Sequence, residues 1–485
     1  MSSKTMFKKR RYTMRQDKLG EECAVIGVSL RCDEAVGIAY NGLLALQHRG
    51  QEAAGIAVTF KHSIQLSKDV GLVGEVFTPA VLEKLPRSDM ALGHTRYSTT
   101  GSNTTSNVQP FVTEYLTGRI ATAHNGNITN SKEIKAKLEK QGLDFSATSD
   151  SEVVSSLIAY NIMQKKDLLK GVIAATEDLE GAFSLILITG DKKMVAVRDP
   201  HGFRPLCIGR NPQGIVIASE SCALDSCCFD FIRDILPGEI VIVEDGKIIY
   251  SGLHLKAKKQ GLCIFEYVYF ARPDSIIDGL SVYQARFNMG RELAKEHPVD
   301  ADVVCGVPDS GLEAAMGYAY ESGLPLVSGF VKNRYIGRSF IFPSQIQREN
   351  AVKIKLNPLR ANIEGKRIVL VDDSIVRGTT SAKIVKSLRS TGVKEIHMRI
   401  SSPPFRHTCH FGTDIDSEAN LIANQISIEE IRKRIDVDSL GYISVEGLVK
   451  ACAKCTLPFC TGCFTGDYGA ESTDTSKFQL EEHNA

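Results

Sequence analysis

The sequence predicts an α/β protein of two unlike domains, in which layered sheets with helices precede a doubly wound α/β domain. Between residue 23 and about residue 255, short strand-like runs are separated by Gly, Asn and Asp, the residues that turns require. From about 256 to 465, helical patterns alternate with continuous apolar runs, which are typical of buried parallel strands. Polar stretches at 1–22 and 466–485 flank the two domains, and we expect the second of them to lie outside the fold.

The strands expected in the first domain are short apolar runs: 23–28, 55–58, 183–188 and 239–243. Two helical patterns interrupt them, at 131–141 and at 151–163. The second helix follows the start signal Ser149-Asp150. Strands and helices in this mixture predict layered sheets with helices, a mixed α/β domain.

The second domain shows the alternation of a doubly wound fold. Buried strands are expected at 301–307 and 367–371, and a helix from Thr380 to Ser390 stops near Gly392. In such folds ligands bind at the carboxyl ends of the strands, which is where candidate site residues are sought.

Composition excludes several classes of function. The 485 residues carry a formal net charge of +1, so no overall field attracts nucleic acid. No run approaches the roughly 20 apolar residues of a membrane span. The basic residues near the start lack the apolar core of a secretory signal, and we expect a cytoplasmic protein. Its 13 cysteines therefore suggest metal, catalytic or buried roles rather than disulfides.

The most informative string runs from Val369 to Ser381. A buried strand ends in two adjacent carboxylates, and a small hydroxyl-rich loop then opens a helix. The loop can bind one phosphate through backbone N–H groups, while the carboxylates can bind ribose hydroxyls, directly or through Mg²⁺. The string resembles the phosphoribosyl pyrophosphate (PRPP) motif of type I phosphoribosyltransferases. This resemblance implies these PRPP-binding residues: Asp372, Asp373, Ser374, Arg377, Gly378, Thr379 and Thr380.

Two upstream elements agree with a PRPP site. The loop 307–311 follows a strand and precedes a helix, so it offers a second anion site, in which Ser310 is the candidate to reach Mg²⁺ together with the two carboxylates. The segment 332–360 is basic and aperiodic, and we expect it to close over pyrophosphate, with Lys332 and Arg334 among the PRPP contacts. A solvated basic surface is the alternative for this segment.

Cys23 opens an apolar strand directly after Glu21-Glu22. The string 22–28 resembles the start of N-terminal nucleophile glutamine amidotransferases after propeptide removal. An N-terminal cysteine offers its own α-amine, whose ordinary pKa is about 8, as the base that activates the thiol. The resemblance implies that 1–22 is a propeptide and that 23–255 is a glutaminase domain with α-β-β-α layers.

Four further strings match blocks of that family in order: 47–55, 93–99, 124–127 and 149–152. The resemblance gives their residues roles in glutamine hydrolysis. Arg49 supports the nucleophile, and Arg96 binds the glutamine carboxylate as a bidentate donor. Asn125 and the Gly126 N–H stabilise the oxyanion, and Asp150 binds the α-ammonium group.

The late cysteines leave two kinds of metal site open. Cys452-x2-Cys455 and Cys460-x2-Cys463 have spacings typical of a local zinc site or of iron–sulfur ligation. The chain from about 22 to 466 resembles the amidophosphoribosyltransferase family, of the type with a propeptide and an iron–sulfur cluster. That resemblance favours one 4Fe-4S cluster on four distant cysteines: Cys263, Cys409, Cys460 and Cys463. Cys452 and Cys455 depart from that pattern, because they could compete as ligands. The six other cysteines after Cys23 are expected to be small core residues: Cys32, Cys207, Cys222, Cys227, Cys228 and Cys305.

The same resemblance implies the reaction. Glutamine is hydrolysed at the first site, and its ammonia crosses to the second site and displaces pyrophosphate from C1 of PRPP. It also implies a homotetramer and feedback inhibition by purine nucleotides. Two alternatives are a glutaminase that serves another acceptor and a non-catalytic PRPP-sensing regulator. The PRPP string argues against the first, and the intact set of glutaminase residues argues against the second.

Overall fold

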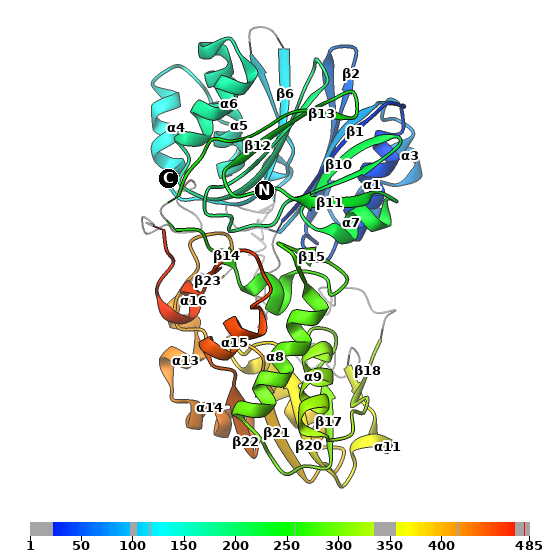
Figure 1. Ribbon diagram of the computed structural model, residues 1–485, viewed down its shortest axis with the longest axis vertical. Helices are drawn as coiled ribbons and strands as arrows, with labels where there is room; N and C mark the ends of the chain where they lie inside the picture. Colours follow the sequence, from blue (N-terminus) through cyan, green and yellow to red (C-terminus); the bar gives the residue numbers. More distant parts are fainter. Residues whose placement is uncertain are drawn as a thin grey trace, which may run out of the picture.

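The computed structural model describes residues 23–97, 104–115, 118–257, 259–333, 356–413, 415, 417–470 and 480. Its two domains lie one above the other along the long axis, with the earlier residues above and the later residues below (Figure 1). Among the described residues, no helix has both the length and the apolar character needed to cross a membrane. The predicted propeptide, residues 1–22, lies outside the described residues.

The first domain holds two antiparallel sheets. The seven-stranded sheet has the order β11-β9-β10-β1-β4-β2-β3. Its strands are β1 (Ala24–Leu30), β2 (Ala53–Phe60), β3 (Ser63–Val70), β4 (Met90–Arg96), β9 (Cys207–Asn211), β10 (Gly214–Ala218) and β11 (Asp230–Asp234). The six-stranded sheet has the order β13-β12-β8-β7-β6-β5. Its strands are β5 (Phe111–Tyr115), β6 (Gly118–Ile128), β7 (Gly181–Thr189), β8 (Lys193–Arg198), β12 (Glu239–Glu244) and β13 (Lys247–Leu253).

Helices cover the outer face of each sheet. An apolar layer between the sheets includes Val25 and Leu92 from one and Ile186 and Val241 from the other. α1 (Ala35–Ala45) and α7 (Ser221–Ser226) pack on the seven-stranded sheet. The six-stranded sheet is covered by α4 (Ser131–Glu139), α5 (Asp150–Lys165) and α6 (Leu168–Glu177). The predicted α-β-β-α layering is confirmed (Figure 1).

The second domain is built on a parallel sheet of order β17-β20-β21-β22. Its strands are β17 (Val303–Gly306), β20 (Arg367–Asp372), β21 (Glu395–Ile400) and β22 (Ser439–Tyr442). One face packs on α8 (Val282–Glu296), α9 (Leu312–Ser322) and α15 (Val445–Ala451). The other face packs on α12 (Thr379–Arg389), α13 (Ile422–Gln425) and α14 (Ile428–Ile435). Because both faces are covered, each strand must be apolar on both sides, which explains the continuous apolar runs in the sequence.

Short paired strands and a π-helix lie where the two domains meet. β14 (Leu262–Cys263) pairs in parallel with β23 (Phe459–Cys460), so the end of the chain returns to the start of the second domain. The π-helix η2 (Glu266–Phe270) and the hairpin of β15 (Ile276–Ile277) and β16 (Leu280–Ser281) follow β14. A second small ladder joins β18 (Phe330–Lys332) to β19 (Leu356–Pro358), at the two ends of the basic segment.

The structure corrects two expectations. Cys228 is exposed and adopts a positive φ of 59° just after α7, so it is not a core residue; Cys32 is only partly buried. The polar tail does not begin as a free segment at 466. The Tyr468 hydroxyl donates a hydrogen bond to the Thr408 carbonyl, and Asp467 forms an ion pair with Lys259. Tyr468, an aromatic residue inside a polar stretch, was the feature of the sequence that could have indicated this packing.

Candidate active sites and a four-cysteine cavity

Cys23 lies directly before β1, beside the end of β4. The pairing of these strands sets Ala24 opposite Thr95, so Cys23 comes next to Arg96. The Cys23 thiol is buried and donates to the Tyr97 carbonyl at 3.3 Å. The pairing of β1 with β4 therefore brings Cys23 and Arg96 together, although they come from different sequence motifs.

Arg96 and Asp150 supply opposite charges near this thiol. Burial lowers the pKa of Arg96, while Cys23, Glu52 and Asp150 act in the opposite direction, so all three lie within electrostatic reach of the guanidinium group. Asp150 opens α5, after Ser149 caps the helix. Burial opposes its ionisation, but His124 and the N–H groups of Ile128 and Ser151 outweigh burial and lower its pKa. Asp150 is thus an ionised carboxylate, suited to an ammonium group.

Asn125 and Gly126 lie near the end of β6. The Asn125 side chain is 1% exposed, and its Nδ2 donor has no hydrogen-bond partner within the described ranges. A buried donor left in this state costs free energy unless a ligand accepts a hydrogen bond from it, as an oxyanion would. Gly126 has φ of 145°, and a Cβ there would lie 1.9 Å from the Ala182 carbonyl oxygen, so only glycine fits.

A side-chain amide holds the same strand in place. Gln109 accepts a hydrogen bond from the His124 N–H at 2.7 Å and donates to the His124 carbonyl at 3.1 Å. The two bonds satisfy the His124 N–H and carbonyl groups, which face the side of β6 where β5 begins only at Phe111. Since His124 also contacts the Asp150 carboxylate, at 3.5 Å, this amide helps to position Asn125, Gly126 and Asp150.

Arg49 links Cys23 to two buried acids. Its Nε donates to the Cys23 carbonyl at 3.2 Å. Its Nη1 donates to Glu220 at 2.7 Å, and both Nη atoms donate to Glu266 at 2.8 Å. All three side chains are fully buried, so the guanidinium charge is balanced by acids from both domains. Arg49 therefore holds the backbone of Cys23 in place.

The second candidate site lies at the carboxyl ends of β17 and β20. These strands pair in parallel, with Gly306 opposite Val371, which brings loop 307–311 beside Asp372 and Asp373. Both carboxylates are buried, and Asp373 accepts hydrogen bonds from the hydroxyls of Ser310 and Ser374. The acids and Ser310 thus form one oxygen-rich group, the donor set that suits Mg²⁺.

A helix start completes this site. Gly378 caps α12 with a positive φ of 79°, and the N-terminal end of such a helix favours an anion. Thr379 and Thr380 form that first turn, and Arg377 is partly exposed beside it. Lys332, at the end of β18, forms an ion pair with Asp309 of loop 307–311. Arg334 lies outside the described residues.

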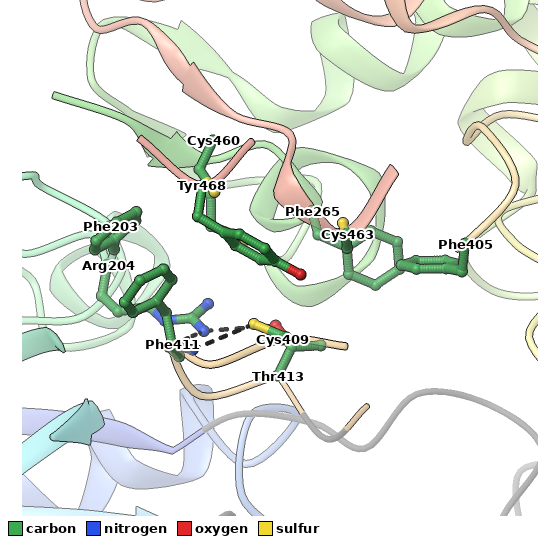
Figure 2. A pocket seen from close by; sticks show the side chains of 11 residues that line it. Phe203, Arg204, Phe265, Phe405, Cys409, Phe411, Thr413, Cys460, Cys463 and Tyr468 are labelled. Atoms are coloured by element: carbon green, nitrogen blue, oxygen red, sulfur yellow. Dashed lines mark hydrogen bonds between the residues drawn. The ribbon is translucent and has the colours of Figure 1, made fainter. Parts of the chain in front are cut away.

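The four cysteines named for a cluster line one cavity, although they come from three distant parts of the chain. Cys263 and Cys460 are register partners in the β14–β23 ladder. The cavity is lined by Cys263, Cys409, Cys460 and Cys463 together with Phe203, Arg204, Phe265, Phe405, Phe411, Thr413 and Tyr468 (Figure 2). Burial, together with the three neighbouring thiols, raises the pKa of Cys463. Four thiols in an apolar enclosure form a donor set that fits an iron–sulfur cluster.

Cys452 and Cys455 do not line this cavity. Cys452 is fully buried in the apolar core around α8 and α15, and Cys455 packs against the same core. A zinc ion needs ligands that converge on one point at about 2.0–2.3 Å. Over the described ranges, no group of three or more His, Cys, Asp or Glu side chains is placed to hold a metal ion in this way. A cluster of four irons separates its thiolates, because each binds a different iron.

Two residues of the first site were not identified from the sequence. Glu220 follows the buried strand β10, and Glu266 lies within the apolar run 262–271. A single acid inside an apolar run signals a buried partner, but the sequence does not indicate which cation it meets.

Comparisons with known proteins agree with both halves of this arrangement. The glutamine amidotransferase domain family matches residues 94–226, and the phosphoribosyl transferase domain family matches residues 281–401. An amidophosphoribosyltransferase of Methanocaldococcus jannaschii is 48% identical over 89% of this chain and 94% of its own length. Arabidopsis thaliana amidophosphoribosyltransferase 2, described as chloroplastic, is 48% identical over 94% of this chain and 81% of its own.

Two solved structures share the whole fold. One, described as the allosteric regulatory enzyme of purine biosynthesis, superposes with a TM-score of 0.86 at 43% identity and covers 94% of this chain and 97% of its own. The other, glutamine PRPP amidotransferase from B. subtilis with ADP and GMP, gives a TM-score of 0.85 at 42% identity and covers 94% and 99%. The likeness spans both sites, which leaves no support for another acceptor or for a non-catalytic regulator. The chain belongs to the amidophosphoribosyltransferase family, glutamine-dependent enzymes that aminate PRPP in the first step of purine synthesis.

Proposed function

We propose that Cys23 is the glutaminase nucleophile and that removal of residues 1–22 frees its α-amine to act as the base. The proposal is supported by a buried thiol at the start of β1, beside Arg96 and within reach of Asp150. Arg96 would bind the α-carboxylate of glutamine, and Asp150 its α-ammonium group. These two charges at one end of the substrate would orient its amide toward the thiol.

The chemistry of the first site follows from these positions. The α-amine takes the thiol proton, and the sulfur attacks the amide carbon to give a tetrahedral oxyanion. The Asn125 amide and the Gly126 N–H would donate to that oxygen. Collapse expels ammonia, which takes up the proton, and leaves a thioester on Cys23. Water then hydrolyses the thioester to glutamate and restores the thiol.

At the second site, ammonia attacks C1 of PRPP and pyrophosphate departs with the bonding electrons of the C1–O bond. The attached nitrogen then loses one proton to the departing pyrophosphate or to water, which gives phosphoribosylamine. Asp372 and Asp373 would hold the ribose hydroxyls, while the first turn of α12 would bind the 5-phosphate. Loop 307–311 and Lys332 would face the pyrophosphate. Mg²⁺ bound with Ser310 and the two carboxylates would supply charge neutralisation as pyrophosphate leaves.

We further propose that the four-cysteine cavity holds a 4Fe-4S cluster with a structural role. Its thiols join the β14–β23 ladder to the loop that carries Cys409, so a cluster there would tie the chain end to the start of the second domain. Neither amide hydrolysis nor glycosyl transfer needs an electron carrier.

Regulation and assembly are inferred from relatives. The B. subtilis structure is described as a complex with ADP and GMP, which supports control of this chain by purine nucleotides. A homotetramer and a cytoplasmic location complete the proposal. The homotetramer is what the family resemblance implies, and the location is the expectation from the sequence.

The observation that carries the proposal is the separation of a thiol site in one domain from a carboxylate site in the other. Cys23→Ala should abolish glutamine-dependent synthesis and retain synthesis from ammonia. Intact-mass analysis of active enzyme should show a chain that starts at Cys23. Full glutamine-dependent activity in a chain that retains residues 1–22 would refute the role of the α-amine.

A further inference from the structure

We propose that the segment Cys409–Thr413 of the second domain positions Gly126 and Asn127 of the first, so that the glutaminase oxyanion site is completed by the other domain. This segment is called the docking segment below. The inference rests on the proposed oxyanion role of Asn125 and Gly126, and it assigns Asn127 and Gly412 as positioning residues rather than catalytic ones.

Two direct contacts join the docking segment to β6. The Asn127 side-chain amide donates to the His410 carbonyl at 2.8 Å. Gly412 lies against Arg204 and Gly126: a Cβ on Gly412 would be 3.1 Å from Arg204 Nη2, 3.3 Å from the Gly126 carbonyl carbon and 3.4 Å from the Gly126 Cα. Gly412 also has φ of 110°, which side chains rarely adopt. Two glycines thus allow the backbones of the two domains to touch at the oxyanion residue.

Gly126 is held from its other side as well. β6 pairs with β7, and Gly126 lies opposite Phe183 in that ladder. The Gly126 backbone is therefore confined between β7 and the docking segment, because a Cβ on Gly126 would meet the Ala182 carbonyl. A shift of the docking segment would release one of these two supports.

The docking segment is itself anchored by buried groups. The Arg204 guanidinium donates to the Phe411 carbonyl at 2.6 Å and forms an ion pair with Glu266 at 3.4 Å. The Phe411 ring stacks on Phe203, with 4.3 Å between centroids, and contacts the ring of Tyr468 (Figure 2). These contacts come from the first domain and from the end of the chain, so the segment has a defined position from which to support Gly126.

This arrangement predicts which rate constant depends on the contact. Loss of one oxyanion donor typically lowers kcat about 10²–10³-fold, so a displaced donor should cost part of that, about 10-fold or more. Ground-state binding of glutamine would use Arg96, at the end of β4, and Asp150, at the start of α5, which belong to other elements of the first domain. The KM for glutamine should therefore change little.

The test compares Asn127→Asp and Gly412→Ala with Asn130→Asp. Asn127→Asp keeps the shape of the side chain but sets an acceptor against the His410 carbonyl. Asn130 is the matched control, since its amide donates to the Asp178 carbonyl at 2.9 Å within the first domain. For each variant, kcat and KM are measured with glutamine and with ammonia. The affinity for the aldehyde analogue of glutamine, whose thiohemiacetal forms an oxyanion, is measured alongside.

We expect both docking variants to lower the glutamine-dependent kcat about 10-fold or more, with KM and ammonia-dependent synthesis nearly unchanged. The aldehyde should bind more weakly by a similar factor, and Asn130→Asp should match the wild type. Unchanged glutamine kcat in both docking variants, or an equal loss with glutamine and with ammonia, overturns the inference. Asn125→Ala separates the two levels of the proposal. If Asn125→Ala retains full glutamine kcat, the oxyanion assignment fails; if it loses activity while neither Asn127→Asp nor Gly412→Ala does, only the docking role fails.

Discussion

Replacement of Glu266 by glutamine tests the buried charge network that joins the two domains. The Glu266 carboxylate accepts hydrogen bonds from both terminal nitrogens of Arg49 at 2.8 Å and forms an ion pair with Arg204 at 3.4 Å. Glutamine keeps the shape but turns one acceptor into an N–H₂ group that faces a guanidinium group. Breaking a buried pair costs about 3–5 kcal/mol; since Glu220 still neutralises Arg49, we expect the lower end, about 3 kcal/mol.

Urea unfolding followed by circular dichroism measures this change, and the midpoint should fall by on the order of 1 M. Glu429→Gln is the matched control, because Glu429 forms a two-bond pair with Arg432 on an exposed helix surface. Solvent screens that pair, so its loss should leave the midpoint unchanged. A Glu266→Gln midpoint equal to that of the wild type would refute the view that this network stabilises the fold.

Three further predictions concern the second site, the cysteine cavity and pH. Asp372→Asn and Asp373→Asn should abolish synthesis from ammonia as well as from glutamine while basal glutamine hydrolysis persists; normal ammonia-dependent synthesis would contradict the PRPP assignment. Protein purified without oxygen should contain about four irons and four sulfides per chain. Cys409→Ser should lose them, whereas Cys455→Ser, outside the cavity, should not; iron analysis decides between this outcome and bound zinc. Burial, with the nearby Asp278, raises the pKa of Asp234 from 3.8 to about 7, so the folded state binds this proton more tightly than the unfolded state. Stability should fall as pH rises from about 4 to about 7, and Asp234→Asn should be more stable relative to the wild type at pH 8 than at pH 5, as thermal unfolding would show.

The two sites could be located from the sequence because each is a local string at the end of a strand. Asp372 and Asp373 lie between a buried strand and a helix start that are consecutive in the sequence, so their placement at the strand end could be predicted. The parallel pairing of β17 with β20 brings loop 307–311 to the same edge of the sheet. The same holds for Cys23 and Arg96, which end neighbouring strands. In these cases the chemistry and the secondary structure lie in one stretch of chain.

The contacts between the domains could not be read in this way. Nothing local to Glu266 points to Arg49, which lies 217 residues earlier, and nothing local to Gly412 points to Gly126. In each pair, one residue lies in the first domain and the other in the second. The two residues meet only because the whole domains pack together. The position of Tyr468 on the cavity was missed for the same reason, since composition alone made its segment look solvent-exposed.

Transfer of labelled nitrogen tests the central claim most directly, namely that the Cys23 site supplies the nitrogen used at the Asp372 site. The enzyme would receive glutamine labelled with ¹⁵N in its amide, PRPP, Mg²⁺ and unlabelled ammonium. The account predicts that phosphoribosylamine made by the wild type carries mainly ¹⁵N, and that Cys23→Ala makes only the unlabelled product. Labelled product from Cys23→Ala would contradict the account, because the nitrogen would then have left glutamine without this thiol.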